Sequence, residues 1–217
     1  NSPSNPVGVV FPEETLRQLA QLAEEYGLLL ISDEAYEKYV YEGEHRGMFP
    51  FINKDNLISI FSFSKTYALT GWRVGYMVAP LYLVKHLAKV EEYLIACTSH
   101  LSQKAAEVAL YLPPEEVEKM VDYYRGNRDK AVSLLEKGGF RFFKPQGGYY
   151  LWIDIREFGL PSLEFCKTLV EDSKVALAPG DAFGERGEGF VRLSICRKRE
   201  DVEEGVKRLV EFRRKRR

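Results

Sequence analysis

The sequence has little cysteine, no surplus of charge of one sign and no long hydrophobic run. Its three cysteines, Cys97, Cys166 and Cys196, are odd in number and far apart, so they predict neither a secreted disulfide framework nor a CxxC metal site. We expect buried or half-buried thiols, as in a cytoplasmic protein. No apolar run approaches the roughly 20 residues that a membrane-spanning helix needs, so no such helix is predicted.

The charges nearly cancel, because 31 Lys and Arg stand against 32 Asp and Glu in 217 residues. This balance excludes a nucleic-acid binder held by a bulk basic surplus. Hydrophobic residues make up 45% of the chain, which is enough for a real core and excludes general disorder. His45, His86 and His100 show no metal-ligand spacing, so no metal site is predicted.

The first half of the chain alternates helix and strand. A proline and two acids precede apolar residues at helical spacing, which predicts a helix with Gly27 at its C-terminal cap. The run 28–31 is apolar on both faces, as strands of helix-covered parallel sheets are. Two more strands are predicted over 57–61 and 74–78. This order predicts an α/β fold with a mostly parallel sheet and helices on both faces.

The second half reads as a smaller α+β unit. A helical pattern begins at Leu81, and Pro113-Pro114 interrupts it before a long amphipathic helix over 115–137. Further elements are expected as strands over 140–143 and 149–155, a helix over 162–171, short strands near 175 and over 190–195, and a last helix from 199. We place one domain over 1–113 and a second over 114–217. The basic run Arg213 to Arg217 predicts a frayed, solvated helix end.

Candidate functional residues follow the second predicted strand. Ser62, Ser64 and Lys65 lie where the carboxyl end of a strand opens onto the crevice that binds ligands in open α/β sheets. Lys65 is either a solvent-facing loop residue or a desolvated nucleophile. Arg73 offers a planar fork for a phosphate group, and the two serine hydroxyls would add donors.

Asp33 directly follows the first predicted strand. Its carboxylate is either a turn cap or an anion that keeps a ring nitrogen protonated. Tyr36 lies on the same side if a helical turn starts there. On their own, Asn5 is only a loop residue and Arg192 is a salt-bridged strand residue.

Four segments together resemble the signatures of the class I/II aminotransferases, which are pyridoxal-phosphate enzymes of the aspartate aminotransferase fold. These segments are Pro3 to Gly8, Ser32 to Tyr36, Ser62 to Tyr76 and Phe190 to Ser194. They follow the family's order from the first residues almost to the last helix. The resemblance implies a large domain that binds the cofactor and a small C-terminal domain.

The resemblance also assigns roles to residues around pyridoxal 5'-phosphate. Lys65 would form the Schiff base with the cofactor and then carry the proton in the amino-transfer step. Asp33 would pair with the pyridine nitrogen, and Tyr36 and Asn5 would hydrogen-bond the ring's phenolic oxygen. Lys65, Asp33 and Tyr36 are therefore the predicted catalytic residues.

Two further groups of residues are implied in the same way. Ser62 and Arg73 would bind the cofactor phosphate, with Ser64 as a further candidate. Arg192, with Asn5 beside it, would bind the substrate α-carboxylate, because a planar guanidinium matches a carboxylate through two hydrogen bonds.

The implied reaction is ping-pong transfer of an amino group between an amino acid and a 2-oxo acid. A carbon–sulfur β-lyase or an amino acid decarboxylase of the same fold is an alternative, and so is a non-catalytic sensor domain of a transcription regulator. Family chains carry an N-terminal arm, early strands and a Gly-rich phosphate loop before the segment that matches Asn5. We therefore expect a C-terminal portion of a longer enzyme that forms a homodimer and binds only small-molecule substrates.

Overall fold

The computed structural model describes residues 1–216, and these residues divide into two compact units. Unit 1 comprises Asn1–Pro3 and Val10–Lys119, whereas unit 2 comprises Ser4–Val9 and Met120–Arg217. The short segment with Asn5 therefore belongs with the C-terminal half of the chain. The place where the two domains of the resembled family divide stays a prediction.

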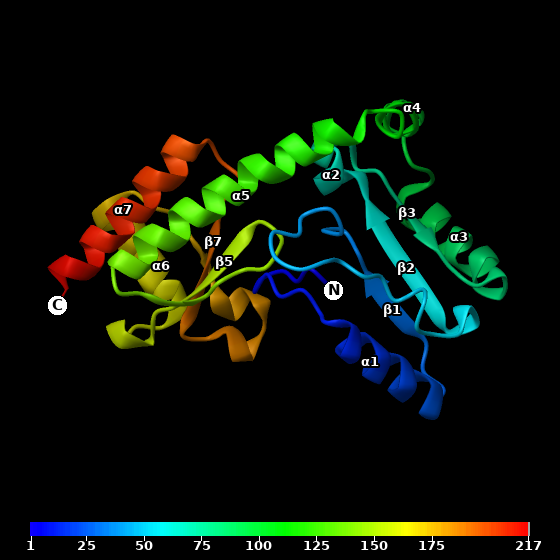
Figure 1. Cartoon of the computed structure of the whole chain (residues 1–217), viewed down its shortest axis with the longest axis horizontal. Helices are drawn as coiled ribbons and strands as arrows, with labels where there is room; N and C mark the ends of the chain where they lie inside the picture. The colour runs from blue at the N-terminus through cyan, green and yellow to red at the C-terminus, as the bar shows by residue number, and fades with distance from the viewer. Residues whose placement is uncertain (217) are drawn as a thin grey trace. The chain divides into compact units, whose positions relative to one another are not determined.

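Unit 1 contains a three-stranded sheet of β1 (Leu30–Asp33), β2 (Leu57–Ser62) and β3 (Gly75–Val78), in that order (Figure 1). Strands β1 and β2 pair in parallel, and β3 runs antiparallel to β2. The three predicted strands are thus all present. The antiparallel β3 returns the chain, so its first residues lie beside the last residues of β2.

Strand β1 differs from its prediction in position and in burial. It begins at Leu30 rather than Leu28, and the side chains of Leu28 and Ile31 are exposed, the latter to 61%. The reason is that only one face of β1 is covered within residues 1–216. Its Leu30 side packs against a cluster that includes residues of the first helix, whereas no described element buries Ile31.

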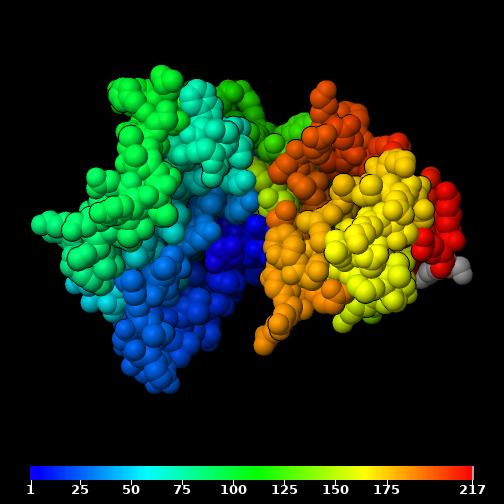
Figure 2. All heavy atoms as spheres, turned by 180° about the vertical axis from the view of Figure 1, so that it is seen from behind, coloured from blue at the N-terminus to red at the C-terminus, as the bar shows by residue number. Residues whose placement is uncertain are grey.

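Three longer helices accompany this sheet, namely α1 (Glu13–Glu25), α3 (Leu81–Ile95) and α4 (His100–Ala109). Helix α1 buries Leu16, Ala20 and Ala23, as its apolar spacing predicts. Gly27 follows its last turn with φ +61°, the left-handed cap predicted for this position. Every residue of α3 is at least partly exposed, and α3 and α4 supply the green surface of unit 1 in Figure 2.

Unit 2 contains a four-stranded antiparallel sheet in the order β4-β5-β7-β6. Its strands are β4 (Arg141–Phe143), β5 (Tyr150–Asp154), β6 (Ala178–Pro179) and β7 (Phe190–Ser194). Its helices are α5 (Pro114–Lys137), whose first turns belong to unit 1, α6 (Ser162–Ser173) and α7 (Arg199–Lys215) (Figure 1). Short 3-10 turns cover 54–56, 70–72, 156–158, 180–183 and 185–187. The core lies between the helices and strands, where Leu151, Phe165 and Leu209 are fully buried.

The predicted frayed end of the last helix is wrong for Arg213. This side chain is buried, and its guanidinium donates two hydrogen bonds of 2.8 Å to the Glu157 carboxylate and one of 2.7 Å to the Gly138 carbonyl. A buried charge persists where it is paired and hydrogen-bonded in this way. Helix α7 therefore stays ordered past Arg213; Arg217, the last residue of the basic run, lies outside the described residues.

The prediction of sheltered cysteines holds for two of the three side chains. Cys166 is buried and Cys196 is half-buried, but Cys97 is exposed, just beyond the end of α3. Burial raises the pKa of the Cys166 thiol to about 11. Within residues 1–216, no helix combines the length and the apolar character that crossing a membrane requires.

Candidate active site

One edge of the sheet in unit 1 gathers most of the predicted site residues. Asp33 ends β1 and Ser62 ends β2, and parallel strands bring their carboxyl ends to the same edge. Gly75, the first residue of β3, pairs with Ser62, and Arg73 lies two residues before it. The anion and the phosphate donors expected from the sequence therefore share this edge.

Ser64 and Lys65 lie on a single helical turn, α2 (Phe63–Thr66), directly after β2. Ser62 caps this turn, because its hydroxyl oxygen accepts a hydrogen bond of 3.2 Å from the Ser64 N–H. The cap uses the oxygen of Ser62 as an acceptor and leaves its O–H as a donor for a ligand. The serine is thus suited to a phosphate oxygen.

Lys65 is half-buried and lies beside Tyr36. Its Nζ is 5.7 Å from the centre of the Tyr36 ring, which is buried. The carbonyl of Lys65 accepts a hydrogen bond of 3.1 Å from the hydroxyl of Tyr39. The structure therefore brings the predicted lysine and the predicted tyrosine together.

Asp33 is a turn cap, which is one of the two roles weighed from the sequence. Its Oδ1 accepts a hydrogen bond of 3.1 Å from the Ala35 N–H, which is the turn cap. The one hydrogen bond found for the Asp33 carboxylate within residues 1–216 uses Oδ1, so Oδ2 can accept from a ligand. One carboxylate can do both, since each oxygen carries two lone pairs.

Arg73, two residues before β3, adopts an uncommon backbone conformation. Its φ of +52° is left-handed, which costs a residue with a Cβ about 1–2 kcal/mol. The exposed guanidinium donates one hydrogen bond of 2.9 Å from Nη1 to the Thr70 carbonyl. Such strained residues concentrate at ligand-binding sites, and the remaining N–H groups of Arg73 suit a phosphate.

Unit 2 brings together the two residues predicted to bind a carboxylate. Nη1 of Arg192 donates to Oδ1 of Asn5 at 2.7 Å, although 187 positions separate the two residues. The guanidinium carbon lies 4.0 Å from the centre of the Tyr150 ring and 4.6 Å from that of Phe183. These aromatic rings hold the cation in place through cation–π attraction.

One donor of Arg192 points to a missing acceptor. Its Nε is buried and makes no hydrogen bond within residues 1–216. A buried N–H of this kind normally has a partner, because leaving it unsatisfied costs about 1–3 kcal/mol. A carboxylate lying along the Nε edge of the guanidinium would supply the acceptor.

The loop that carries Asn5 is anchored through Gly8. The Gly8 carbonyl accepts hydrogen bonds of 2.8 Å from Gln146 and 3.1 Å from Gly147. A Cβ at Gly8 would lie 2.4 Å from the Cβ of Pro145, and its φ is +78°. Only glycine fits this close approach, which fixes the loop so that Asn5 reaches Arg192.

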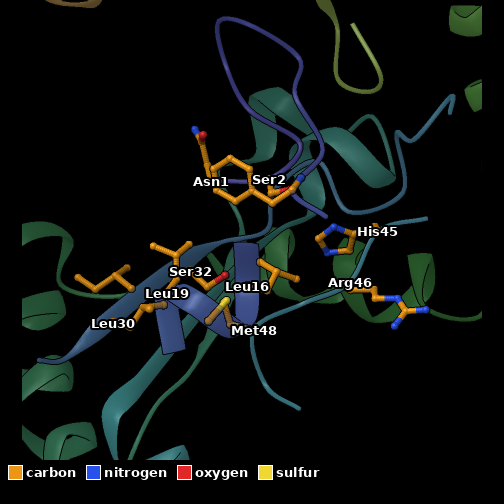
Figure 3. A pocket seen from close by; sticks show the side chains of 11 residues that line it. Asn1, Ser2, Leu16, Leu19, Leu30, Ser32, His45, Arg46 and Met48 are labelled. Carbon is orange, nitrogen blue, oxygen red and sulfur yellow. The ribbon is translucent and has the colours of Figure 1, made fainter. Parts of the chain in front are cut away.

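A hydrogen bond next to Asp33, between buried Glu34 and half-buried His45, was not predicted from the sequence. Glu34 is only 4% exposed, and its carboxylate accepts hydrogen bonds of 3.1 Å from Nε2 of His45 and from the Ser32 hydroxyl. Since an ionised carboxylate only accepts, Nε2 of His45 carries the proton. Ser32 and His45 also line a pocket beside α1 and β1 (Figure 3). Glu34 thus ties the loop with His45 to the end of β1.

The hydrogen bond between Glu34 and His45 predicts that the free energy of unfolding decreases as the pH falls into the acid range. Burial by itself raises the pKa of the Glu34 carboxyl, but hydrogen bonds from His45, Ser32 and the Met48 N–H outweigh it and hold the pKa below its ordinary value. A depressed folded-state pKa stabilises the fold above the unfolded pKa and loses that contribution as pH falls through the folded value. We therefore expect Glu34→Gln to cost about 1–3 kcal/mol at neutral pH and less near pH 3.

Urea unfolding at both pH values measures this difference. Glu44→Gln, on the same loop but exposed, is the matched control and should change little at either pH. A cost at Glu34 that is equally large near pH 3 would show that the ionised carboxylate is not its source.

Sequence reasoning also missed three aromatic residues that hold the site. Tyr39 hydrogen-bonds the Lys65 carbonyl, and Tyr150 and Phe183 lie against the Arg192 guanidinium. Nothing in their local sequence marks them, because each acts on a residue from a distant segment. Within residues 1–216, no three His, Cys, Asp or Glu side chains form a cluster that suits a metal ion.

Comparisons with known proteins place these residues in a family. The family model described as aminotransferase class I and II matches residues 1–209. A probable aspartate aminotransferase of Methanocaldococcus jannaschii is 40% identical over an alignment of 212 residues, and the match covers 95% of this chain and 55% of the relative. A probable N-acetyl-LL-diaminopimelate aminotransferase of Bacillus subtilis is 37% identical, over 97% of this chain and 53% of the relative.

Solved structures agree with the sequence comparison. An aromatic aminotransferase from Pyrococcus horikoshii superposes with a TM-score of 0.95 at 34% identity, over 100% of this chain and 59% of that one. An aspartate aminotransferase from Thermotoga maritima gives 0.91 at 34% identity, over 99% and 55% of the two chains. The chain thus spans a little over half the length of these proteins, and the predicted α/β class is confirmed. The chain belongs to the class I and II aminotransferase family.

Proposed function

We propose that this chain supplies the lysine, the ring-binding residues and the carboxylate-binding arginine of an aminotransferase that uses pyridoxal phosphate. The proposal rests chiefly on the sheet edge in unit 1, where Lys65 lies beside Tyr36 and Asp33 and Ser62 end adjacent strands. The substrates would be an amino acid and a 2-oxo acid, exchanged in a ping-pong sequence.

The residues at that edge fit the cofactor in chemistry as well as in position. When bound, pyridoxal phosphate supplies an electron sink that stabilises negative charge at the amino acid's α-carbon. Oδ2 of Asp33 would accept from the ring nitrogen and keep it protonated. The Ser62 hydroxyl and the guanidinium of Arg73 would donate to the phosphate.

Lys65 would perform the covalent attachment and the proton transfer. Its Nζ, half-buried beside the Tyr36 ring, is a primary amine that can attack a carbonyl once it is neutral. Once the substrate amine has displaced it, Nζ would take the proton from the substrate α-carbon and donate it to the carbon of the cofactor that receives the amino group. The Tyr36 hydroxyl, and Asn5 through its amide, would hydrogen-bond the ring oxygen.

Arg192 would hold the substrate carboxylate along its Nε edge. Asn5 occupies its Nη1, so the unpartnered Nε and the adjacent Nη2 are the donors that face a ligand. Two parallel hydrogen bonds from a planar cation fix the orientation of the carboxylate and therefore select which bond at the α-carbon reacts.

The full-length protein, loaded with pyridoxal phosphate and given one amino acid, tests this proposal. We expect stoichiometric pyridoxamine phosphate and 2-oxo acid in the first half-reaction, and amino acid again after a second oxo acid is added. Pyruvate with a thiol, or carbon dioxide with an amine, would instead identify the lyase or the decarboxylase. Bound cofactor without any product would favour a sensor domain.

The identity of the substrate and the assembly also belong to this proposal. The names of the relatives refer to aspartate, aromatic or N-acetyl-LL-diaminopimelate aminotransferases. A screen of amino acid substrates should therefore begin with these classes. We also propose, from the family resemblance, that the full-length protein is a homodimer. Light scattering at several protein concentrations would measure its mass.

A further inference from the structure

Tyr39 makes a contact that none of the assigned roles explains. Its side chain is fully buried, with 0% exposure, in the segment that follows β1. Its hydroxyl donates a hydrogen bond of 3.1 Å to the main-chain carbonyl of Lys65, 26 positions further along the chain. A buried tyrosine needs a partner for its hydroxyl, and here that partner is the peptide of the lysine proposed to react.

On one side, Tyr39 is tied to the residues expected around the cofactor ring. Its N–H donates a hydrogen bond of 2.8 Å to the Tyr36 carbonyl, so the two tyrosines belong to one turn. The preceding turn begins at Glu34, whose carbonyl accepts from the Glu37 N–H at 3.0 Å. Tyr39 is thus connected through consecutive turns to the end of β1, where Asp33 lies.

At the other end of this hydrogen bond, Lys65 lies on a short helix that is weakly stable by itself. Helix α2 is one turn of four residues, and a turn of this length has little stability of its own. Beyond it the chain passes through Ala68, whose φ of +55° is left-handed. The Lys65 carbonyl also accepts from the N–H groups of Tyr67 and Ala68, the latter at 3.3 Å. Local bonds alone therefore hold this turn weakly, and a tertiary bond to its carbonyl matters.

We propose that Tyr39 is a positioning residue that fixes the backbone of Lys65 relative to Tyr36 and Asp33. The inference rests on the proposed function, in which Nζ of Lys65 must reach a reacting carbon held by those residues. A long lysine side chain amplifies any tilt of its peptide, and small misplacements of a reacting group are costly in rate. The Tyr39 hydroxyl links α2, which carries Lys65, to the segment after β1, which carries Tyr36. The distance between these two segments determines where Nζ of Lys65 lies.

Tyr39→Phe tests the inference in the full-length protein, because it removes one hydroxyl and keeps the ring. The Lys65 carbonyl keeps its two backbone donors, so we expect the variant to fold. The rate at which the cofactor-free protein captures pyridoxal phosphate, followed by visible absorbance, should fall about 3- to 10-fold. The rate constant of the first half-reaction should fall by a similar factor, whereas the apparent affinity for the amino acid should change less than about 2-fold.

Tyr82→Phe is the control, at a tyrosine that is exposed rather than buried. Its hydroxyl makes the same kind of bond, 3.0 Å to the Asp55 carbonyl, but before the opposite end of β2. Both variants should be compared well below their unfolding temperatures, and Tyr82→Phe should capture cofactor and react as the unmodified protein does. Equal losses in both variants would mean general loosening of unit 1 and would overturn the inference.

Two results separate this inference from the proposed function. If the cofactor attaches to Lys65 but Tyr39→Phe captures it and reacts at the unmodified rates, the positioning role is wrong and the proposed function stands. If the cofactor attaches to another lysine in the unmodified protein, the proposed function falls, and the role of Tyr39 falls with it.

Discussion

Replacing Lys65 by alanine should lower the rate of amino transfer about 10⁴-fold or more, the largest effect that we expect from any single substitution. Nζ of Lys65 has two tasks in the proposed function, since it attaches the cofactor and carries the proton at the substrate α-carbon. Proton transfer by a positioned side chain alone contributes about 10²–10⁴-fold, and loss of the covalent attachment adds to this. The single-turnover rate with one amino acid measures the loss.

Cofactor binding should be weakened by Lys65→Ala rather than abolished. Asp33, Ser62 and Arg73 lie at the same edge of the sheet and do not depend on the Nζ group for their positions. An absorbance titration with pyridoxal phosphate would show this residual binding. Lys85→Ala, at an exposed position of α3, is the control and should leave both measurements unchanged. A Lys65→Ala protein within tenfold of the unmodified rate would remove Lys65 from the mechanism.

Replacing Arg192 by lysine should raise KM for the amino acid about 10- to 100-fold. The ammonium of lysine keeps the charge but loses the planar pair of donors, and hydrogen bonds to charged groups are worth about 1.5–3 kcal/mol. The substitution also removes the contacts of the planar guanidinium with the rings of Tyr150 and Phe183, which a compact ammonium does not replace. Steady-state kinetics with a varied amino acid gives KM.

The affinity for pyridoxal phosphate separates this role from a general defect. Because Arg192 is assigned to the substrate, Arg192→Lys should change cofactor affinity only a few-fold. Arg208→Lys serves as the control, since Arg208 lies on α7 in an exposed ion pair with Glu204 and should alter neither quantity. A loss of cofactor affinity as large as the rise in KM would contradict the assignment of Arg192 to the carboxylate.

The order of elements was predictable because it depends on local patterns. The apolar spacing of α1 and its cap at Gly27, and the strands that became β2 and β7, come from residues close together in the chain. The positions of Asp33 at the end of β1 and of Lys65 just beyond β2 follow from the same patterns. These features need no knowledge of what packs against them.

Contacts between distant segments were not predictable from such patterns. The burial of Arg213 depends on Glu157, and the bond from Tyr39 depends on where α2 lies. The local sequence around a basic helix end or a tyrosine does not show which distant residue it will contact. Family resemblance assigned Asn5 and Arg192 to the substrate, but only the structure shows their direct hydrogen bond.

The position at which the cofactor is covalently attached tests the central claim most directly. The full-length protein, loaded with pyridoxal phosphate, is reduced with borohydride, digested and analysed by mass spectrometry. The proposed function predicts one modified peptide, with the pyridoxyl group on Lys65. Modification at a different lysine, or the absence of any attached cofactor, would contradict it.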